Sequence, residues 1–401
     1  MCALNHFDVV VIGGGIIGCS VSYHLTKAGY DVALVEKGEV ASGTSSRCDA
    51  VALISDKKPG LDTEFGYKSI EMYKQLAEEL SFDFDFSTRG SLYVCETDVE
   101  LEIAGSYAKD QKAAGYTMDV VDNKTLLNIE PNLAKDLAGG VWTEVDSTMN
   151  PYLVCYAFIE EAQKMGLTLY KNHEVLSIKT GVNNQIEAVI TDKTTIYTKK
   201  AVNCAGVWAS KIGELVNINI PIQPRKGIIL VTEMTDRIVN QKVHEYGYML
   251  SKFEDIDYIR QVSDRIEDNN IAFTIEPTTA DNYLIGGHRA FDGFNSNLNM
   301  DVMQGIAERA TRFIPKLQEV NCIRAYAGVR PWVVDHLPIV SDVEEVPGFY
   351  IAAGHEGDGI SLAPITGRIM TQIISEEQTE FDVSQLSFSR YKNNTNKLHL
   401  V

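Results

Sequence analysis

Residues 7–38 read FDVVVIGGGIIGCSVSYHLTKAGYDVALVEKG, and this stretch decides the fold. It opens with a β-branched apolar run that is typical of a buried parallel strand. Gly13, Gly15 and Gly18 follow as a G-x-G-x-x-G motif, and the next apolar residues recur at helical spacing. A second apolar run ends in Glu36. A strand, a glycine turn, a helix and a strand with a terminal acid together predict a dinucleotide-binding βαβ unit.

The glycines and the acid have separate physical tasks in such a unit. Gly13 allows the tight turn, Gly15 lets a pyrophosphate approach the helix N-terminus, and Gly18 lets helix and strand pack closely. Glu36 can accept hydrogen bonds from ribose hydroxyls, and its charge would repel a 2′-phosphate, which disfavours NADP. The motif by itself leaves NAD and FAD open. The alternative is a structural βαβ unit whose glycines bind no nucleotide.

A polar loop, VASGTSSRCDA, follows the second predicted strand. Its small hydroxyl residues, Ser42, Thr44, Ser45 and Ser46, lie beside Gly43. Hydroxyl groups of this kind can donate hydrogen bonds to a pyrophosphate or to the edge of a flavin. The loop is therefore predicted to contact the cofactor, and an ordinary polar turn is the alternative.

The composition restricts the classes of protein to which the chain can belong. With 401 residues and 45% hydrophobic composition, it can build a sizeable core divided between two domains. A net charge of −19 disfavours nucleic-acid binding, and no apolar run reaches the roughly 18 residues of a membrane span. The N-terminal segment enters a strand at once, which leaves no room for a signal peptide. Seven scattered cysteines without a C-x-x-C pair favour a cytoplasmic protein and argue against a bound metal or iron–sulfur cluster.

Five segments in this order carry a resemblance to a known family: VVVIGGGIIGCSVSYHLTKAGYDVALVEKG, ASGTSSR, AVNCAGVWA, RPWVVDHLPIV and GHEGDGISLAPITGRIM. Over nearly its whole length, the chain resembles the FAD-dependent amine and amino-acid oxidoreductases of the D-amino-acid oxidase superfamily. Glycine oxidase, sarcosine oxidase and the β subunits of amino-acid dehydrogenases belong to this superfamily. The segment SSRCDAVALISDKKPG resembles most the β subunits of D-hydroxyproline-type dehydrogenases.

The resemblance implies an α/β fold, α+β overall, in which a Rossmann-type FAD-binding domain carries an antiparallel-sheet substrate cap domain. The FAD-binding domain is predicted to be discontinuous and to comprise residues 1–85, 146–220 and 326–401. Residues 86–145 and 221–325 are predicted to form the cap. FAD is expected to be bound non-covalently.

Taken residue by residue, the same resemblance implies which positions bind FAD. They are Gly13, Gly15, Ile16, Ile17, Gly18, Glu36, Lys37, Ser42, Thr44, Ser45, Ser46, Val175, Ala205, Gly206, Trp208, Arg330, Gly354, Gly357, Gly359 and Ile360. A helix from Ile360 to Ile374 is expected to point its N-terminus at the flavin. The partial positive charge there would stabilise the anion that forms when the flavin accepts a hydride.

Arg330, in the segment YAGVRPWVVDHLPIV, is the first catalytic candidate. An arginine in an otherwise core-like stretch requires an anionic partner. The resemblance implies that this partner is the carboxylate of the substrate, and a structural ion pair with Asp335 or another acid is the alternative. Tyr246, Tyr248 and Tyr258 are candidates to close over the substrate, and His355 in the glycine loop is a candidate base.

The motifs and the resemblance together predict an FAD-dependent oxidoreductase that acts on CH–NH or CH–NH2 groups. The expected substrate is a small amino acid of the sarcosine, glycine, D-amino-acid or hydroxyproline type, which loses a hydride to flavin N5 and becomes an imine. Leu284 stands where sarcosine oxidases place a lysine, and Cys322 is not clearly equivalent to the cysteine that tethers the flavin in the monomeric enzymes. These departures favour a dehydrogenase with electron-accepting partner subunits. The alternatives are an oxygen-using amino-acid oxidase, a 2-hydroxy-acid dehydrogenase and a non-catalytic flavoprotein subunit that relays electrons.

Overall fold

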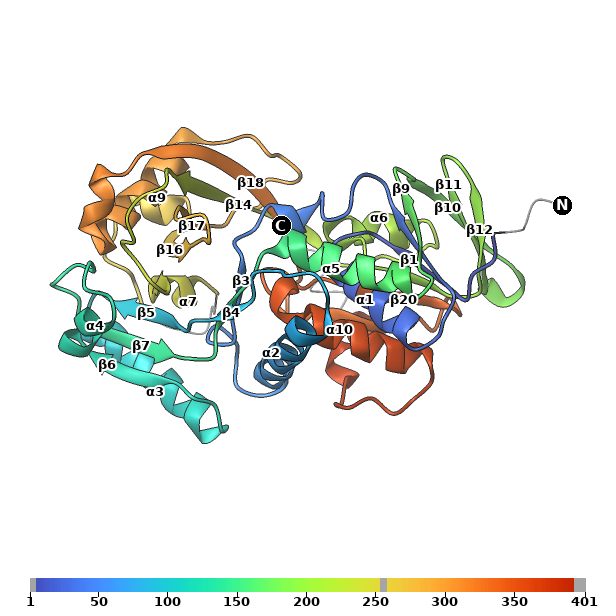
Figure 1. Cartoon of the computed structure of the whole chain (residues 1–401), viewed down its shortest axis with the longest axis horizontal. Helices are drawn as coiled ribbons and strands as arrows, with labels where there is room; N and C mark the ends of the chain where they lie inside the picture. Colours follow the sequence, from blue (N-terminus) through green and yellow to red (C-terminus); the bar gives the residue numbers. More distant parts are fainter. Residues whose placement is uncertain (1–4, 253–257, 393–401) are drawn as a thin grey trace.

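Two large β-sheets organise the chain (Figure 1). The computed structural model describes residues 5–252 and 258–392. A six-stranded, mainly parallel sheet lies on the right of the view, and an eight-stranded, mainly antiparallel sheet lies on the left. This combination confirms the predicted mixed α/β fold. Within the described ranges, no helix is both long enough and apolar enough to cross a membrane.

The six-stranded sheet contains the βαβ unit that the glycine motif predicts. Its strand order is β19-β20-β13-β1-β2-β9, and each neighbouring pair is parallel except β19 with β20. The strands are β1 (Val9–Ile12), β2 (Val32–Glu36), β9 (Thr168–Lys171), β13 (Ala201–Asn203), β19 (Ile339–Asp342) and β20 (Phe349–Ala353). Helix α1 (Ile16–Lys27) connects β1 to β2, which confirms the prediction for residues 7–38.

Both faces of this sheet are covered. Because successive side chains of a strand point to opposite faces, Val9 and Val11 pack with the helices while Val10 and Ile12 pack on the other side. The covering elements are α1, α2 (Leu61–Glu79), α5 (Pro151–Lys164) and α10 (Gly359–Ile374) on one face, and β10 (Val175–Thr180), β11 (Ile186–Thr191) and β12 (Thr195–Tyr197) on the other. Burial on both faces explains why β1 and β2 are nearly continuous apolar runs.

The eight-stranded sheet has the order β18-β14-β17-β16-β15-β5-β7-β6. Its neighbours pair antiparallel, except β15 with β5, which are parallel. The strands are β5 (Ser91–Cys95), β6 (Asp119–Asp122), β7 (Gly139–Thr143), β14 (Gln223–Thr232), β15 (Lys242–Glu245), β16 (Ile271–Pro277), β17 (Tyr283–His288) and β18 (Cys322–Trp332).

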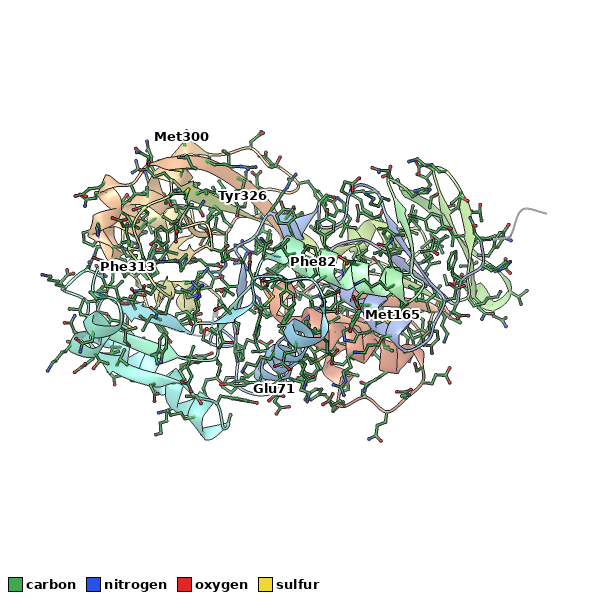
Figure 2. The ribbon with its side chains drawn as sticks, in the orientation of Figure 1. Glu71, Phe82, Met165, Met300, Phe313 and Tyr326 are labelled. Carbon is green, nitrogen blue, oxygen red and sulfur yellow. The ribbon has the colours of Figure 1, made fainter. Side chains whose placement is uncertain are left out.

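Short and medium helices accompany this second sheet. They are α3 (Asp98–Ala113), α4 (Asn123–Ile129), α7 (Gly247–Lys252), α8 (Asp264–Asp268) and α9 (Met300–Phe313). Helix α9 packs on β16 and β17, where the ring of Phe313 stacks on that of Phe273 with centroids 5.2 Å apart. Met300 begins the same helix and is exposed at the upper edge of the view (Figure 2). The eight-stranded sheet therefore has a core of its own.

Two features connect the sheets. Strands β14 and β18 pair along their whole length, from Gln223 opposite Trp332 to Thr232 opposite Cys322. A small sheet of β3 (Val51–Ala52), β8 (Ser147–Thr148) and β4 (Ser87–Thr88) lies between the large sheets in Figure 1. Because β18 crosses the predicted boundary between residues 325 and 326, the division into domains by residue range stays a prediction.

Candidate active site

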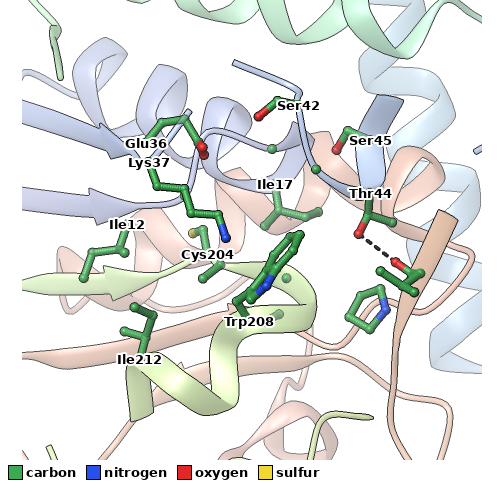
Figure 3. A pocket seen from close by; sticks show the side chains of 18 of the residues that line it. Ile12, Ile17, Glu36, Lys37, Ser42, Thr44, Ser45, Cys204, Trp208 and Ile212 are labelled. Carbon is green, nitrogen blue, oxygen red and sulfur yellow. Dashed lines mark hydrogen bonds between the residues drawn. The ribbon is translucent and has the colours of Figure 1, made fainter. Parts of the chain in front are cut away.

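A cavity of about 730 Å³ lies at the carboxyl ends of the parallel strands (Figure 3). Ligands of open α/β sheets bind at this edge, and the volume suits a cofactor-sized molecule. The predicted cofactor-binding residues that line it are Gly13, Gly15, Ile16, Ile17, Glu36, Lys37, Ser42, Thr44, Ser45, Val175, Ala205, Gly206, Trp208, Gly354 and Gly359. Arg330, Gly357 and Ile360 line a smaller adjoining cavity of about 70 Å³.

At Gly13 and Gly18 of the motif, a side chain would clash with the backbone. Gly13 has φ +110°, and a Cβ there would lie 2.6 Å from the carbonyl oxygen of Cys204. A Cβ at Gly18 would lie 1.8 Å from the carbonyl oxygen of Gly13. Gly18 therefore packs the helix on the turn and does not line the cavity. Gly15 is the N-cap residue of α1, so the free amides of the first helical turn begin at the cavity.

Glu36 is held rigidly at the end of β2. Its Oε2 accepts the amide of Gly14 at 2.7 Å, and its Oε1 accepts the amide of Gly38 at 2.7 Å. Each carboxylate oxygen has a second lone pair, so the side chain can accept further hydrogen bonds from the cavity. This geometry suits the predicted contact with ribose hydroxyls.

The hydroxyl loop after β2 is shaped by its own side chains. Thr44 donates to the carbonyl oxygen of Val329 at 2.8 Å, which ties the loop to β18 (Figure 3). Ser45 accepts the amide of Ile16 at 3.0 Å. The hydroxyl of Ser46 donates to the carbonyl of Gly43 at 3.1 Å, and Ser46 does not line the cavity. Ser46 therefore shapes the loop, because its hydroxyl is directed at the backbone.

Trp208 forms one wall of the cavity. It ends the short helical turn Gly206–Trp208, and the ammonium of Lys37 lies 4.1 Å from the centroid of its ring (Figure 3). The ring of Phe294 also stacks with that of Trp208, with centroids 5.8 Å apart. A cation on an aromatic face is attracted to the ring electrons, so Lys37 is positioned by Trp208.

His355 lies in the loop between β20 and α10, where it is buried and lines the larger cavity. Its Nε2 shares a hydrogen bond of 3.0 Å with the hydroxyl of Thr366. Burial is the main cause that lowers the pKa of this imidazole to about 3, so the ring is neutral at physiological pH. A base with so low a pKa removes protons poorly, and a catalytic role for His355 stays a prediction.

Arg330 is directed at the smaller cavity from β18. Its Nη1 donates to the carbonyl of His288 at 3.2 Å, and within the described part of the chain no carboxylate lies at ion-pair distance from it. Asp335, its alternative partner, instead accepts Nε of Arg390 at 2.8 Å and the hydroxyl of Tyr391 at 2.8 Å. The alternative of an Arg330–Asp335 ion pair is therefore wrong.

Of the three candidate tyrosines, Tyr246 and Tyr258 line neither the larger nor the smaller cavity. Tyr246 is 2% exposed and packs in the cluster of α3 and β5, and the hydroxyl of Tyr258 lies 3.2 Å from that of Thr97. Tyr248, the third candidate, lines the smaller cavity, and the guanidinium of Arg289 lies 4.0 Å from its ring centroid. The turn from β15 into α7 places Tyr246 and Tyr248 in different surroundings, although they are only two positions apart. Residue type alone does not indicate which of the two lines a cavity.

The sequence analysis missed a further acid at the smaller cavity. Asp49 lines it together with Arg330, Leu284 and Thr274. The signal available in the sequence was an acidic residue two positions before the buried strand β3. Its partners come from distant strands, so the sequence carried no local indication of its position.

Comparison with known proteins agrees with this geometry. Residues 8–373 match the DAO family, described as FAD dependent oxidoreductase. The chain is 23% identical over 394 residues to glycine oxidase from Geobacillus kaustophilus, which covers 96% of this chain and 98% of that protein. It is 26% identical over 436 residues to hydrogen cyanide synthase subunit HcnC from Pseudomonas protegens, with 97% of each chain covered.

The fold is also that of a solved structure. The crystal structure of L-proline dehydrogenase from P. horikoshii superposes with a TM-score of 0.87 at 24% sequence identity. The superposition covers 98% of this chain and 99% of that one. At this level of identity the likeness concerns the fold, and it confirms the predicted Rossmann-type domain combined with an antiparallel sheet.

Proposed function

The chain belongs to the DAO family of FAD-dependent oxidoreductases, and from this premise we propose that it oxidises the Cα–N bond of a small amino acid. One observation carries the proposal: Arg330 lies at the smaller cavity, which adjoins the larger one, and pairs with no described carboxylate. Its guanidinium offers a planar fork that matches a carboxylate with two parallel hydrogen bonds. The adjoining cavities thus suit a cofactor and a small carboxylate-bearing substrate.

The residues of the larger cavity fit FAD. A Cβ at Gly15 would meet the hydroxyl of Ser45 at 3.3 Å and no other atom within 4 Å, so the backbone there is open to a pyrophosphate. Glu36 would hold the ribose through its remaining lone pairs. Gly359, the first residue of α10, also lines this cavity, so the N-terminus of that helix faces it.

The protein's part in the reaction is positioning and electrostatics. FAD, when bound, supplies the hydride acceptor. Arg330 would hold the substrate carboxylate and so orient Cα, while the N-terminus of α10 would stabilise negative charge at the cofactor. The apolar side chains of Leu284 and Ile229 line the smaller cavity and reduce its access to water. The product imine would then hydrolyse, or remain cyclic if the substrate is proline-like.

We further propose that the enzyme is a dehydrogenase that passes its electrons to a partner protein. Leu284 lines the smaller cavity at the position where the resemblance implies a lysine in sarcosine oxidases. Cys322 is exposed at the far end of β18 and lines neither cavity, which supports non-covalent attachment of FAD. The relative HcnC is by its name a subunit, which supports assembly with other chains.

Anaerobic reduction of the bound flavin tests this function. Against a panel of D- and L-amino acids, sarcosine, glycine and hydroxyprolines, at least one compound is expected to bleach the flavin absorption. Turnover with an artificial dye is expected to exceed turnover in air, and peroxide formed as fast as dye is reduced would instead identify an oxidase. Bleaching by 2-hydroxy acids alone would identify a hydroxy-acid dehydrogenase, and no bleaching at all would favour the non-catalytic subunit.

Glu36→Arg is expected to weaken FAD binding by about 10- to 100-fold, because it removes charged hydrogen-bond acceptors and adds a bulky group at the ribose position. The FAD dissociation constant measures this effect. Acid precipitation of the wild-type protein should release all FAD into the supernatant. Glu39→Arg is the matched control, because Glu39 is exposed, pairs with Lys171 and does not line the cavity. Equal FAD affinities in the two variants would contradict the predicted role of Glu36.

A further inference from the structure

A carboxylate is fixed at the edge of the smaller cavity by a buried lysine. The Oδ2 of Asp49 accepts the ammonium of Lys242 at 2.8 Å. The side chain of Lys242 is 1% exposed, whereas that of Asp49 is 41% exposed. Because Asp49 lines the same cavity as Arg330, its exposed part faces the space into which Arg330 points. Asp49 is therefore anchored on one side and accessible on the other.

A second buried acid fixes the lysine in turn. The Oε2 of Glu276, on β16, lies 3.4 Å from the ammonium of Lys242 and accepts the amide of Ala50 at 3.1 Å. Glu276 thus holds both the lysine and the backbone next to Asp49. The three side chains come from segments more than 30 residues apart, so their arrangement belongs to the cavity and not to a local turn.

Asp49 carries a negative charge within this cluster. Burial acts to raise the pKa of the Asp49 carboxyl, but the Lys242 ammonium and the Arg330 guanidinium outweigh it and hold the pKa below its ordinary value. Burial raises the pKa of Glu276 to about 7. Asp49 is consequently ionised at neutral pH, with Oδ1 accepting no hydrogen bond from the described residues.

We propose that Asp49 binds the amine nitrogen of the substrate while Arg330 binds its carboxylate. This inference rests on the proposed function and adds to it the chemical class of the ligand: a compound with an N–H donor one carbon away from a carboxylate. An N–H donor opposite the free Oδ1 would make a charge-assisted hydrogen bond. A hydroxy acid or an ether acid of the same shape lacks a charged N–H donor, so Asp49 selects against it.

Isosteric ligand pairs test the assignment. Sarcosine and methoxyacetate differ in the replacement of the amine by an ether oxygen, as do proline and tetrahydro-2-furoate. For the amino acid, the apparent dissociation constant is taken from the concentration dependence of anaerobic flavin reduction. For the ether acid, the inhibition constant is taken from competition in the same assay. Asp49→Asn is expected to raise the apparent dissociation constant of the amino acid by about 10- to 100-fold. The inhibition constant of the ether acid is expected to change by less than about twofold.

Asp292→Asn is the matched control. Asp292 also pairs with a buried lysine, Lys226, at 3.2 Å, and its side chain is 48% exposed, but it does not line the smaller cavity. The control should leave the affinities for both ligands unchanged. Asp49→Glu should recover part of the amino-acid affinity, because it keeps the charge. FAD content shows that each variant is folded.

The outcomes separate the two levels of the hypothesis. If Asp49→Asn weakens the binding of both members of a ligand pair equally, or weakens the binding of neither, the amine-binding role of Asp49 is overturned while the proposed function stands. If no amino acid reduces the flavin of the wild-type enzyme, the proposed function itself is overturned, and the role of Asp49 with it. Selective loss of the amino acid supports both.

Discussion

Arg330→Ala is expected to lower kcat/KM for the amino-acid substrate by about 30- to 5000-fold and to leave the FAD content near that of the wild type. This range corresponds to roughly 2–5 kcal/mol, the cost of removing one partner of a buried, hydrogen-bonded charge pair. In the protein without substrate, the guanidinium donates to the carbonyl of His288, so its removal disturbs few contacts of the fold. Steady-state kinetics with a dye, together with the flavin absorption, measure both effects.

Two variants control for charge and for position. Arg330→Lys should recover part of the activity, because lysine keeps the charge but lacks the planar fork. Arg324→Ala removes an exposed arginine from the same strand, and kcat/KM should stay within about twofold of the wild type. The prediction fails if Arg330→Ala keeps its flavin and its KM for amino acids yet loses thermal stability, because that result describes a structural arginine.

Lys57→Met is expected to lower the free energy of unfolding by about 3–5 kcal/mol, the cost of breaking a buried ion pair. The side chain of Lys57 is fully buried, and its ammonium lies 2.8 Å from Oδ1 of Asp358. Asp62 lies 3.7 Å from the same ammonium. Methionine has a similar shape but leaves these carboxylates without that cation. Because Asp358 immediately precedes α10, whose N-terminus faces the FAD cavity, FAD retention should fall as well.

Chemical unfolding in excess FAD measures the change in stability. The control is Lys112→Met, which breaks an ion pair with Asp119 whose side chains are 54% and 51% exposed. An exposed pair contributes at most about 1 kcal/mol, so this variant should unfold close to the wild type. The double variant Lys57→Met/Asp358→Asn should be more stable than the single one, because it removes a buried charge. Equal unfolding midpoints for Lys57→Met and Lys112→Met would refute the prediction.

The sequence by itself determined the elements whose signals are local. The order of apolar runs and glycines predicted β1, α1 and β2, and the helix expected from Ile360 to Ile374 corresponds to α10 (Gly359–Ile374). The close packing at Gly18 follows from the spacing of the motif, since a strand followed by a helix leaves no room for a Cβ there. Such features depend on residues near one another in the chain, so residue type and periodicity suffice to predict them.

Only the tertiary structure decided which side chains meet at the smaller cavity. Residue type indicated that Arg330 requires an anion. That Asp335 pairs with Arg390 and not with Arg330 depends on where the C-terminal segment packs. The choice of Tyr248 over its neighbours depends on the turn between β15 and α7. Asp49 is held at this cavity by Lys242, a residue 193 positions away. Contacts of this kind arise when the two sheets come together, and the hydrophobic pattern that specifies each sheet carries no information about which polar groups then face one another.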